Sequence, residues 1–369
     1  MPAERTGEID TFLAANGWSG ARRTPIVGDA STRRYIRLQQ AGRKAILMDQ
    51  PQNAEAPAAP AGATPDERRA LGYNAVARLA GADVARFVAA ANYLRACGLS
   101  APDIYAADPG SGFAVIEDLG DALYSDVATA HNEFELYKAA AEVLATLHAR
   151  AAPKRLPLDK ELHPYDETAL LAEIDLLTDW FMPAALGRAA TKDEVAEHRA
   201  LWQAVLRQTL TAPAVFVHRD YHAQNLLWMP ERSGLARVGL IDFQDAVAGS
   251  NAYDLISLVE DARRDVAPEI AEATTRHYLA MMRAQGVMID EGAYRSQMAV
   301  MAAQRNAKIA GIFARLFKRD GKPRYLGYLP RVWGYLNRDL EDPALGLLKA
   351  WYDRAIPREK RGRPQGVEQ

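Results

Sequence analysis

Three oxygen-bearing side chains in the second half of the chain have the types and the spacing needed for phosphoryl transfer. Asp220 follows the apolar run 215–217, Asn225 comes five residues later, and Asp242 ends a second apolar stretch. A carboxylate at the end of a strand can face a cleft without being buried unpaired, and there it can accept the proton of an alcohol. Carboxylate and amide oxygens are also the hard ligands that Mg²⁺ takes beside water and nucleotide phosphates. We therefore expect Asp220 to be the catalytic base and Asn225 and Asp242 to bind Mg²⁺.

The order H-x-D-x-x-x-x-N, followed by Ile-Asp, matches the catalytic and metal-binding half of the protein-kinase signature. The chain departs from protein kinases at Phe243-Gln244, where they carry Phe-Gly. The blocks 218–225 and 241–255 instead resemble the aminoglycoside phosphotransferase family of small-molecule kinases. This resemblance implies an α+β, two-lobed, protein-kinase-like fold, with a small antiparallel sheet in the N-terminal lobe and a mostly helical C-terminal lobe. It also implies ATP and Mg²⁺ as cofactors.

Four stretches resemble, more finely, the sugar kinases of cell-wall recycling within that family: 28–35, 46–49, 241–246, and 311–316 together with 319–326. This similarity implies transfer of the γ-phosphoryl group of ATP to the anomeric hydroxyl of an amino sugar, N-acetylmuramate or N-acetylglucosamine, in peptidoglycan recycling. Two alternatives stay open. One is a kinase of the same fold that acts on an aminoglycoside or another small alcohol, because fold does not fix substrate. The other is a nucleotide-binding pseudokinase that serves as an interaction module.

The residues that contact the nucleotide are expected mainly in the N-terminal lobe. The stretch 28–34 precedes the first predicted strand, 35–38. A tight loop there can offer backbone N–H groups, hydroxyls and the positive charge of arginine to the ATP phosphates. The alternative is an ordinary turn. The family places a phosphate-binding lysine where this chain has Met48-Asp49, and the helix 84–97 lacks the glutamate that would pair with it. A strand end at the connection between the lobes is a usual place for a nucleotide. The predicted nucleotide-binding residues are Ser31, Thr32, Arg33, Arg34, Lys44, Glu117 and Leu119.

Four cations share one side of a long predicted helix, 292–317, and its continuation, while apolar side chains occupy the other side. The plain interpretation is a solvated face. If the substrate is N-acetylmuramate, its lactyl carboxylate calls for a cation, and arginine can bind it through two hydrogen bonds. A cationic aminoglycoside would be repelled by the same surface, and a tyrosine in the loop 320–326 can stack on a sugar. The predicted substrate-binding residues are Asp220, Arg305, Lys308, Arg315 and Tyr325, with Arg319 completing the cationic stripe.

One histidine and one further aspartate near the catalytic block, His218 and Asp254, are assigned structural roles. Histidine is a common general base, so His218 is a possible one, but we expect its imidazole to brace the loop by hydrogen bonds. His218 and His222 have the spacing of zinc ligands on a helix, yet no glutamate follows the first histidine as in H-E-x-x-H, so a zinc hydrolase is disfavoured. Asp254 either caps a helix or, as the resemblance implies, braces the catalytic loop.

The composition indicates a globular protein whose net charge is too small to attract nucleic acid or an anionic membrane. A chain of 369 residues with 49% hydrophobic residues can bury at least one sizeable core. The net charge of −2 gives no attraction for nucleic acid or for an anionic membrane surface, so neither partner is expected. The single cysteine cannot form an intrachain disulfide, and the first thirty residues lack a signal pattern. We expect a cytoplasmic monomer whose partner is a small-molecule amino sugar.

Periodicity places the boundary between the lobes at residue 117. The predicted lobes are 1–117 and 118–356, followed by a flexible tail, 357–369. Residues 51–65, rich in Ala, Pro, Gly and Asn, are expected to form a mobile loop. Strands are predicted over 35–38, 45–48 and 113–116, and helices over 8–17, 84–97, 134–149, 167–181, 192–210, 268–285 and 292–317.

Overall fold

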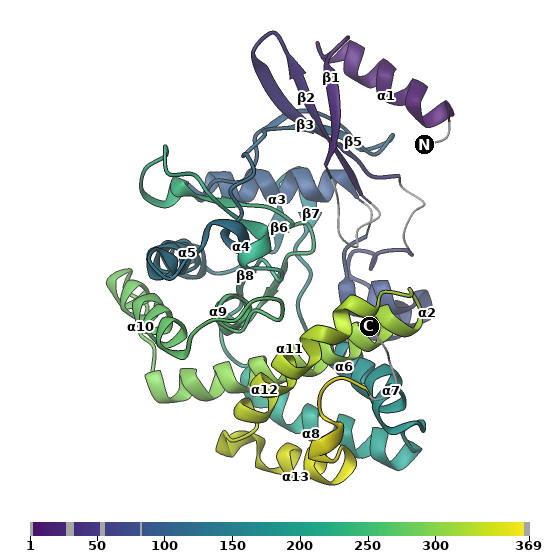
Figure 1. Ribbon diagram of the computed structural model, residues 1–369, viewed down its shortest axis with the longest axis vertical. Coiled ribbons are helices and arrows are strands. Elements are labelled where there is room, and N and C mark those ends of the chain that lie inside the picture. Colours follow the sequence, from purple (N-terminus) through teal and green to yellow (C-terminus); the bar gives the residue numbers. More distant parts are fainter. Residues whose placement is uncertain (1–2, 27–32, 52–55, 82, 365–369) are drawn as a thin grey trace. The chain divides into compact units, whose positions relative to one another are not determined.

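The computed structural model describes residues 3–26, 33–51, 56–81 and 83–364, which belong to two compact units (Figure 1). Unit 1 comprises residues 1–127, 153–163 and 224–246, and unit 2 comprises residues 128–152, 164–223 and 247–369. This division differs from the predicted single boundary at residue 117, because two later segments belong to unit 1. The segment 224–246 is tied to unit 1 by backbone hydrogen bonds from Leu240 to Ser100 and from Trp228 to Ala122, each 2.8 Å long.

Unit 1 contains a five-stranded antiparallel sheet in the order β1-β2-β3-β5-β4. Its strands are β1 (Arg22–Ile26), β2 (Arg34–Gln40), β3 (Arg43–Asp49), β4 (Ile104–Asp108) and β5 (Phe113–Ile116). The three inner strands are the three predicted ones. Sequence patterning missed the two edge strands, β1 and β4. In these strands apolar and polar residues alternate only weakly along the sequence. Pro25 in β1 is typical of an edge, because proline cannot donate to a ladder.

The helix α1 (Ala3–Ala15) packs on this sheet and starts five residues earlier than predicted. Its apolar residues Ile9, Phe12 and Leu13 join Trp18 and the buried side chains of the inner strands in one core. The ring of Phe12 is stacked on that of Phe113, with centroids 5.3 Å apart. The remaining helices and strands of unit 1 are α2 (Pro65–Leu71), a π-helix (Asn74–Arg78), α3 (Val84–Ala96), α4 (Tyr124–Val127), β6 (Arg155–Leu156), β7 (Lys160–Glu161), β9 (Leu226–Trp228) and β10 (Val238–Leu240).

The Ala- and Pro-rich segment predicted as a mobile loop lies partly outside the described residues, which omit 52–55. Residues 56–64 contain no helix or strand but are attached by hydrogen bonds to other segments, among them one from the Asn74 side chain to the Ala56 carbonyl over 3.1 Å. The N–H of Ala59 donates to the carbonyl of Leu79 over 3.1 Å, and the N–H of Gly62 donates to the Glu161 carboxylate over 3.0 Å. The described part of the segment therefore has fixed contacts within unit 1.

Unit 2 is built almost entirely of helices, as predicted (Figure 1). The helix α5 packs against α10, and the long helix α11 packs against α6, α9 and α12. A two-stranded antiparallel pair, β8 (Val215–Val217) with β11 (Val247–Gly249), completes the unit. The helices are α5 (Glu133–His148), α6 (Glu167–Leu176), α7 (Met182–Leu186), α8 (Lys192–Thr209), α9 (Ala252–Val259), α10 (Pro268–Ala284), α11 (Glu291–Lys318), α12 (Leu329–Asp339) and α13 (Gly346–Ala355).

The crossing of α11 over α6 depends on a glycine. A Cβ atom on Gly311 would lie 2.3 Å from the carbonyl carbon of Leu176, at the point where α6 continues as the π-helix Leu177–Phe181. No side chain fits in that space, so the two backbones can approach closely only with glycine at this position.

The predicted flexible tail is fixed over its described part, which ends at residue 364. The Arg361 guanidinium donates to the carbonyl of Ile356 and to the side chains of Asn337 and Asp353, over 2.9, 2.7 and 2.7 Å. It also lies over the ring of Trp333, 5.7 Å from the centroid. One arginine therefore attaches residues 357–364 to unit 2, through contacts that the sequence does not predict.

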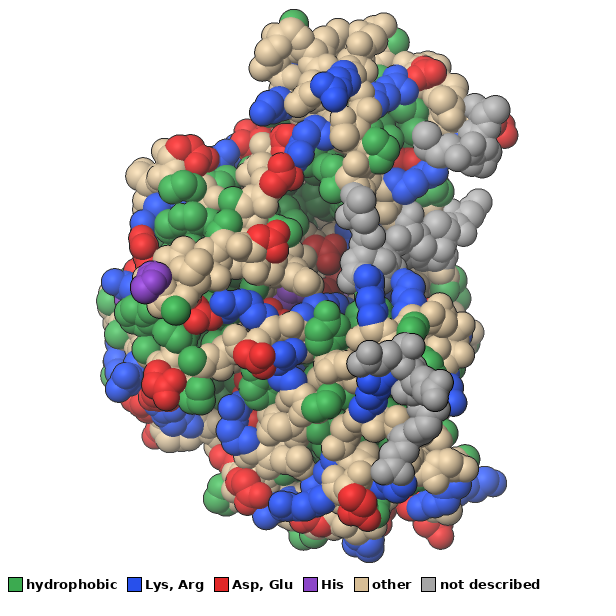
Figure 2. Space-filling view, in the orientation of Figure 1, with side chains coloured by type: hydrophobic (Ala, Val, Ile, Leu, Met, Phe, Trp, Pro, Cys, Tyr) green, Lys and Arg blue, Asp and Glu red, His purple; other side chains and the backbone are tan. Residues whose placement is uncertain are grey.

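The outer surface is mixed in charge. In the face shown in Figure 2, lysine and arginine side chains are interspersed with aspartate and glutamate over the described residues. Among those residues, no helix is both long enough and apolar enough to cross a membrane.

Candidate functional site

The catalytic loop, residues 218–223 of unit 2, leaves the buried strand β8 and is held by one buried carboxylate. Asp254, in the first turn of α9, accepts the backbone N–H of His218 over 2.6 Å and that of Arg219 over 2.8 Å. All three residues are buried. The cap of α9 is Asn251, so Asp254 braces the loop rather than capping its own helix. Charge-assisted hydrogen bonds to backbone N–H groups are strong, which fixes the chain just before Asp220.

Arg219 has an uncommon backbone conformation, with φ at +81°. A non-glycine residue is held there only when its surroundings determine the geometry. The Arg219 guanidinium pairs with the Glu173 carboxylate of α6 over 2.5 Å and lies over the ring of Tyr165. Lys308 of α11 pairs with the same carboxylate over 2.8 Å. Glu173 of α6 therefore holds the residue that precedes Asp220 and also binds Lys308 of α11.

Glu173 is the centre of a larger buried network. Its second oxygen accepts hydrogen bonds from Tyr165 and from Gln304, the latter over 3.1 Å. Burial tends to raise the pKa of a carboxyl group, but Lys308 and Arg219 outweigh it and hold the pKa of Glu173 below its ordinary value. Glu173 is thus a buried carboxylate with two cationic partners.

Asp220, the predicted base, is partly exposed, which is compatible with contact to a substrate. Two residues later, burial lowers the pKa of His222 to about 4, and the nearby Asp261 only partly opposes this. His222 is therefore neutral at physiological pH. Its Nε2 atom lies 3.5 Å from the Arg263 guanidinium, a neighbour that would repel a metal ion. This geometry offers no support for the zinc interpretation.

Asn225 and Asp242 lie at the same end of a β-hairpin in unit 1. The strands β9 and β10 pair so that Leu226 is opposite Leu240, and the Ile241 N–H donates to the Asn225 carbonyl over 3.2 Å. Asp242 follows directly. The register thus brings the two predicted metal ligands together, and both side chains are partly exposed. A carboxylate and an amide oxygen at one position suit Mg²⁺, which usually takes one or two protein oxygens and completes its shell with phosphates and water.

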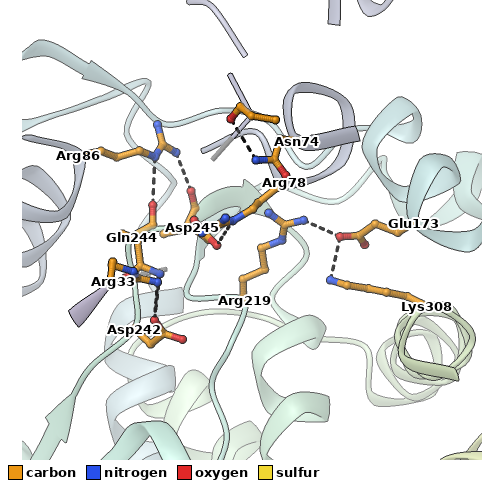
Figure 3. A network of polar contacts seen from close by, with 12 residues as sticks. Arg33, Asn74, Arg78, Arg86, Glu173, Arg219, Asp242, Gln244, Asp245 and Lys308 are labelled. Carbon is orange, nitrogen blue, oxygen red and sulfur yellow. Dashed lines mark hydrogen bonds and ion pairs between the residues drawn. The ribbon is translucent and has the colours of Figure 1, made fainter. Parts of the chain in front are cut away.

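Three arginines of unit 1 bind the segment that carries Asp242, residues 242–246, through ion pairs and hydrogen bonds (Figure 3). Arg33 pairs with Asp242 over 3.0 Å, and Arg78 pairs with Asp245 over 2.7 Å. Arg86, buried on α3, donates to the carbonyls of Gln244 and Ala246 over 3.1 and 2.9 Å. The inward charged residue of α3 is therefore an arginine that binds the segment's backbone, which agrees with the absence of the usual glutamate. Stacking of the Phe243 ring on Phe87 of α3, 5.0 Å between centroids, adds an apolar contact.

The structure places the other predicted nucleotide-binding residues of the N-terminal part in different surroundings. Ser31 and Thr32 lie outside the described residues. Arg34 pairs with Asp49, its register partner across β2 and β3, over 2.6 Å. Arg5 of α1 binds the same buried carboxylate over 2.7 Å. The position at which the family pattern has a lysine thus holds an aspartate neutralised by two arginines.

Lys44 does not fit a phosphate-binding role. It is exposed near the β2–β3 turn, opposite Gln39. Five residues of strand separate it from Asp49, a length of about 16 Å. Arg33 and Asp242 lie beyond the Asp49 end, so Lys44 lies at the opposite end of β3 from them, and this position does not favour the predicted phosphate contact.

Glu117 and Leu119 follow β5 at the predicted connection. Glu117 pairs with Arg232 over 2.5 Å and accepts the N–H of Asp103 over 3.2 Å. The Leu119 side chain lies close to Gly239 of β10. A Cβ atom added to Gly239 would lie 3.3 Å from Cδ1 of Leu119. Leu119 thus flanks the hairpin that presents Asn225 and Asp242.

The predicted cationic stripe on α11 is not a free surface. Arg305 is buried and donates to the carbonyl of Glu260 over 3.1 Å, and Lys308 is committed to Glu173. Both residues fall on one helix face as predicted, but the Glu173 carboxylate pairs with Lys308 and the Glu260 carbonyl accepts a hydrogen bond from Arg305. Tyr325 is 1% exposed and packs against Phe313, with ring centroids 5.3 Å apart. A ring buried in this way does not fit stacking on a sugar. Arg315 is half-buried and remains compatible with substrate binding.

Two residues that support the site escaped sequence analysis. Glu173 and Arg86 each carry a charge on the apolar face of a predicted helix, among buried leucine, alanine or phenylalanine neighbours. Charged residues are almost never fully buried unless they are paired, so this placement was the available signal. The partners, Arg219 and the carbonyls of 244 and 246, are too far along the chain to be identified from it.

The relatives found by comparison with known proteins are all phosphotransferases or kinases. A sequence model of the phosphotransferase enzyme family matches residues 22–288. The chain is 45% identical to the N-acetylmuramate/N-acetylglucosamine kinase of Caulobacter vibrioides over 368 residues, covering 98% of this chain and 99% of that relative. It is 31% identical to the protein of the same name in Pseudomonas putida, covering 89% and 88%. The ADP-bound aminoglycoside phosphotransferase APH(2'')-Ib superposes with a TM-score of 0.52 at 15% identity, covering 91% of this chain and 97% of that one, which shows the shared fold.

Proposed function

Because the chain belongs to the phosphotransferase enzyme family, we propose that it is an ATP-dependent kinase of N-acetylmuramate and N-acetylglucosamine. The observation that supports this substrate most strongly is the 45% identity to the Caulobacter vibrioides kinase over nearly the full length of both chains. The proposed acceptor is the anomeric hydroxyl, in a reaction of peptidoglycan recycling. A kinase needs the compartment that supplies ATP, so the proposal places the enzyme in the cytoplasm.

In this mechanism, the Asp220 carboxylate accepts the proton of the sugar hydroxyl while the hydroxyl oxygen attacks the γ-phosphorus of ATP. The bond between the γ-phosphorus and the bridging oxygen breaks, and ADP leaves with that oxygen. Asn225 and Asp242 are the residues that would hold Mg²⁺, which when bound neutralises the phosphate oxygens. Asp254 and the Glu173–Arg219 pair contribute by fixing the backbone that aims Asp220.

Arg315 is the residue of the predicted substrate set that we retain for the lactyl carboxylate of N-acetylmuramate. A guanidinium can bind a carboxylate through two parallel hydrogen bonds. This assignment predicts that Arg315→Met raises the KM for N-acetylmuramate more than the KM for N-acetylglucosamine, which has no lactyl group. Equal effects on both sugars would count against it.

The product identifies the reaction. Purified protein is incubated with Mg-ATP and N-acetylmuramate, N-acetylglucosamine or kanamycin, and the products are followed by phosphorus NMR. The proposal predicts a phosphorus resonance coupled to the C1 proton of both amino sugars. Turnover of kanamycin but of neither amino sugar would overturn the substrate. Nucleotide binding without turnover of any alcohol would support the pseudokinase alternative.

A further inference from the structure

We propose that Arg33 is the cation that binds the triphosphate, and that before nucleotide arrives it neutralises the metal-binding carboxylate of Asp242. Mg²⁺ is then taken up together with the nucleotide and only weakly without it. This inference rests on the proposed function, because it assigns a residue to the ATP site. It also identifies a cation for the triphosphate in a chain that has aspartate where the family pattern has lysine.

The contact that supports the proposal lies within unit 1. The Arg33 guanidinium is buried and donates from Nη2 to Oδ1 of Asp242 over 3.0 Å. Gln244 donates to the same oxygen over 3.1 Å (Figure 3). The Tyr35 hydroxyl lies 3.4 Å from Nη1 of Arg33 and helps to orient the guanidinium. Asp242 is 38% exposed, so an incoming metal can reach its carboxylate although Arg33 is enclosed.

The other arginines described near Arg33 and the segment 242–246 have partners that are not predicted metal ligands. Arg34 and Arg5 share the buried Asp49. Arg78 is paired with Asp245, and Arg86 binds backbone carbonyls. Arg33 differs from them because its partner is itself a predicted metal ligand.

A divalent cation on Asp242 would place two more positive charges beside the Arg33 guanidinium. Like charges at such a short separation repel strongly when one of them is buried. Free Mg²⁺ must therefore compete with Arg33 for the carboxylate. A triphosphate removes the conflict, because its oxygens supply negative charge to Arg33 and to the metal together. The ion pair thus couples metal binding to nucleotide binding, and couplings of this kind typically amount to 5–150-fold.

The test measures metal binding directly, with Mn²⁺ as the probe and electron paramagnetic resonance as the readout, in the absence of sugar and nucleotide. Arg33→Gln is expected to bind free Mn²⁺ at least about fivefold more tightly than the wild type. The same variant is expected to raise the KM for ATP about tenfold or more, because a charged hydrogen bond to phosphate is lost. Opposite shifts in two affinities are not expected from a merely structural residue.

Two further variants complete the design. Arg34→Gln makes the same charge change one residue away and should leave Mn²⁺ affinity within about twofold of the wild type. Arg33→Lys keeps the charge without the bidentate fork, so it should bind Mn²⁺ nearly as the wild type does and show an ATP KM raised about fivefold. Circular dichroism confirms folding, and if Arg33→Gln does not fold, the ATP KM of Arg33→Lys decides.

Unchanged Mn²⁺ affinity in folded Arg33→Gln, or an unchanged ATP KM in Arg33→Lys, would overturn the proposal. Its failure is distinguishable from failure of the proposed function. A wild type that phosphorylates no amino sugar refutes the function through the NMR product, whereas the Mn²⁺ measurement needs no acceptor.

Discussion

Replacing Glu173 by glutamine should destabilise the protein and misplace the catalytic base at the same time. Glu173 is 1% exposed and pairs with Arg219 over 2.5 Å and with Lys308 over 2.8 Å. Glutamine keeps the shape but removes the negative charge, which leaves two largely buried cations without a counter-charge. Breaking a buried ion pair in this way costs about 3–5 kcal/mol, so we expect the free energy of unfolding to fall by about that amount.

The same variant should also lower kcat. Arg219, at its positive φ, is held by Glu173 and directly precedes Asp220. A displacement of a catalytic group by about 1 Å can cost roughly 10²-fold, and we expect a loss of that order. The KM for ATP should change by less than about threefold, because Asn225 and Asp242 are untouched.

Urea unfolding followed by tryptophan fluorescence, together with steady-state kinetics at pH 7.5, measures both effects. The matched control is Glu272→Gln, which removes an exposed carboxylate paired with Arg295 and should cost less than about 1 kcal/mol. The pKa of Glu173 is lowered in the fold from an ordinary value of 4.5, because Lys308 and Arg219 outweigh its burial. Its contribution is therefore complete above pH 4.5 and is lost as the pH falls through the folded pKa, so the wild type and the variant should converge in acid. A variant that loses less than 1 kcal/mol and keeps wild-type kcat would refute the reasoning.

Three further predictions follow from single contacts. Gly311→Ala should lower the free energy of unfolding by about 2 kcal/mol, because the new methyl group meets the Leu176 carbonyl; an unchanged thermal midpoint would contradict the helix crossing. His222, whose pKa is lowered to about 4 from 6.5 by burial, should make the wild type less stable by about 3 kcal/mol as the pH falls from 6.5 to 4. His222→Asn should flatten that part of the profile in urea titrations, and parallel profiles would show that His222 is not buried in the neutral form. Lys44→Ala should leave the KM for ATP within about twofold of the wild type, since Lys44 is exposed at the far end of β3; a tenfold increase would restore Lys44 as a phosphate ligand.

The elements that sequence patterning predicted well are those with one clearly apolar face. The helix predicted at 268–285 spans Pro268–Ala284, and the strand predicted at 113–116 spans Phe113–Ile116. The missed strands β1 and β4 are edges, where exposed side chains weaken the alternation on which such predictions depend. Local pattern therefore located the core elements but not the sheet's borders.

The same limit applies to the site. Asp220, Asn225 and Asp242 could be proposed from the sequence because their residue types and spacing are contained in short blocks, and their roles stay predictions. Sequence patterning places Arg305 and Lys308 on one helix face, but it does not show that Arg305 binds the Glu260 carbonyl or that Lys308 pairs with Glu173 of α6. Periodicity gives the direction of a side chain relative to its own helix, whereas burial depends on what other elements pack there.

The most direct test of the central claim compares Asp220→Asn with the wild type. The substitution preserves shape and removes the proton acceptor. We predict that kcat for N-acetylmuramate falls by roughly 10²–10⁴-fold, while binding of Mg-nucleotide, measured by calorimetry, stays within about twofold. Turnover near that of the wild type in the purified variant would contradict the assignment of Asp220 as the base.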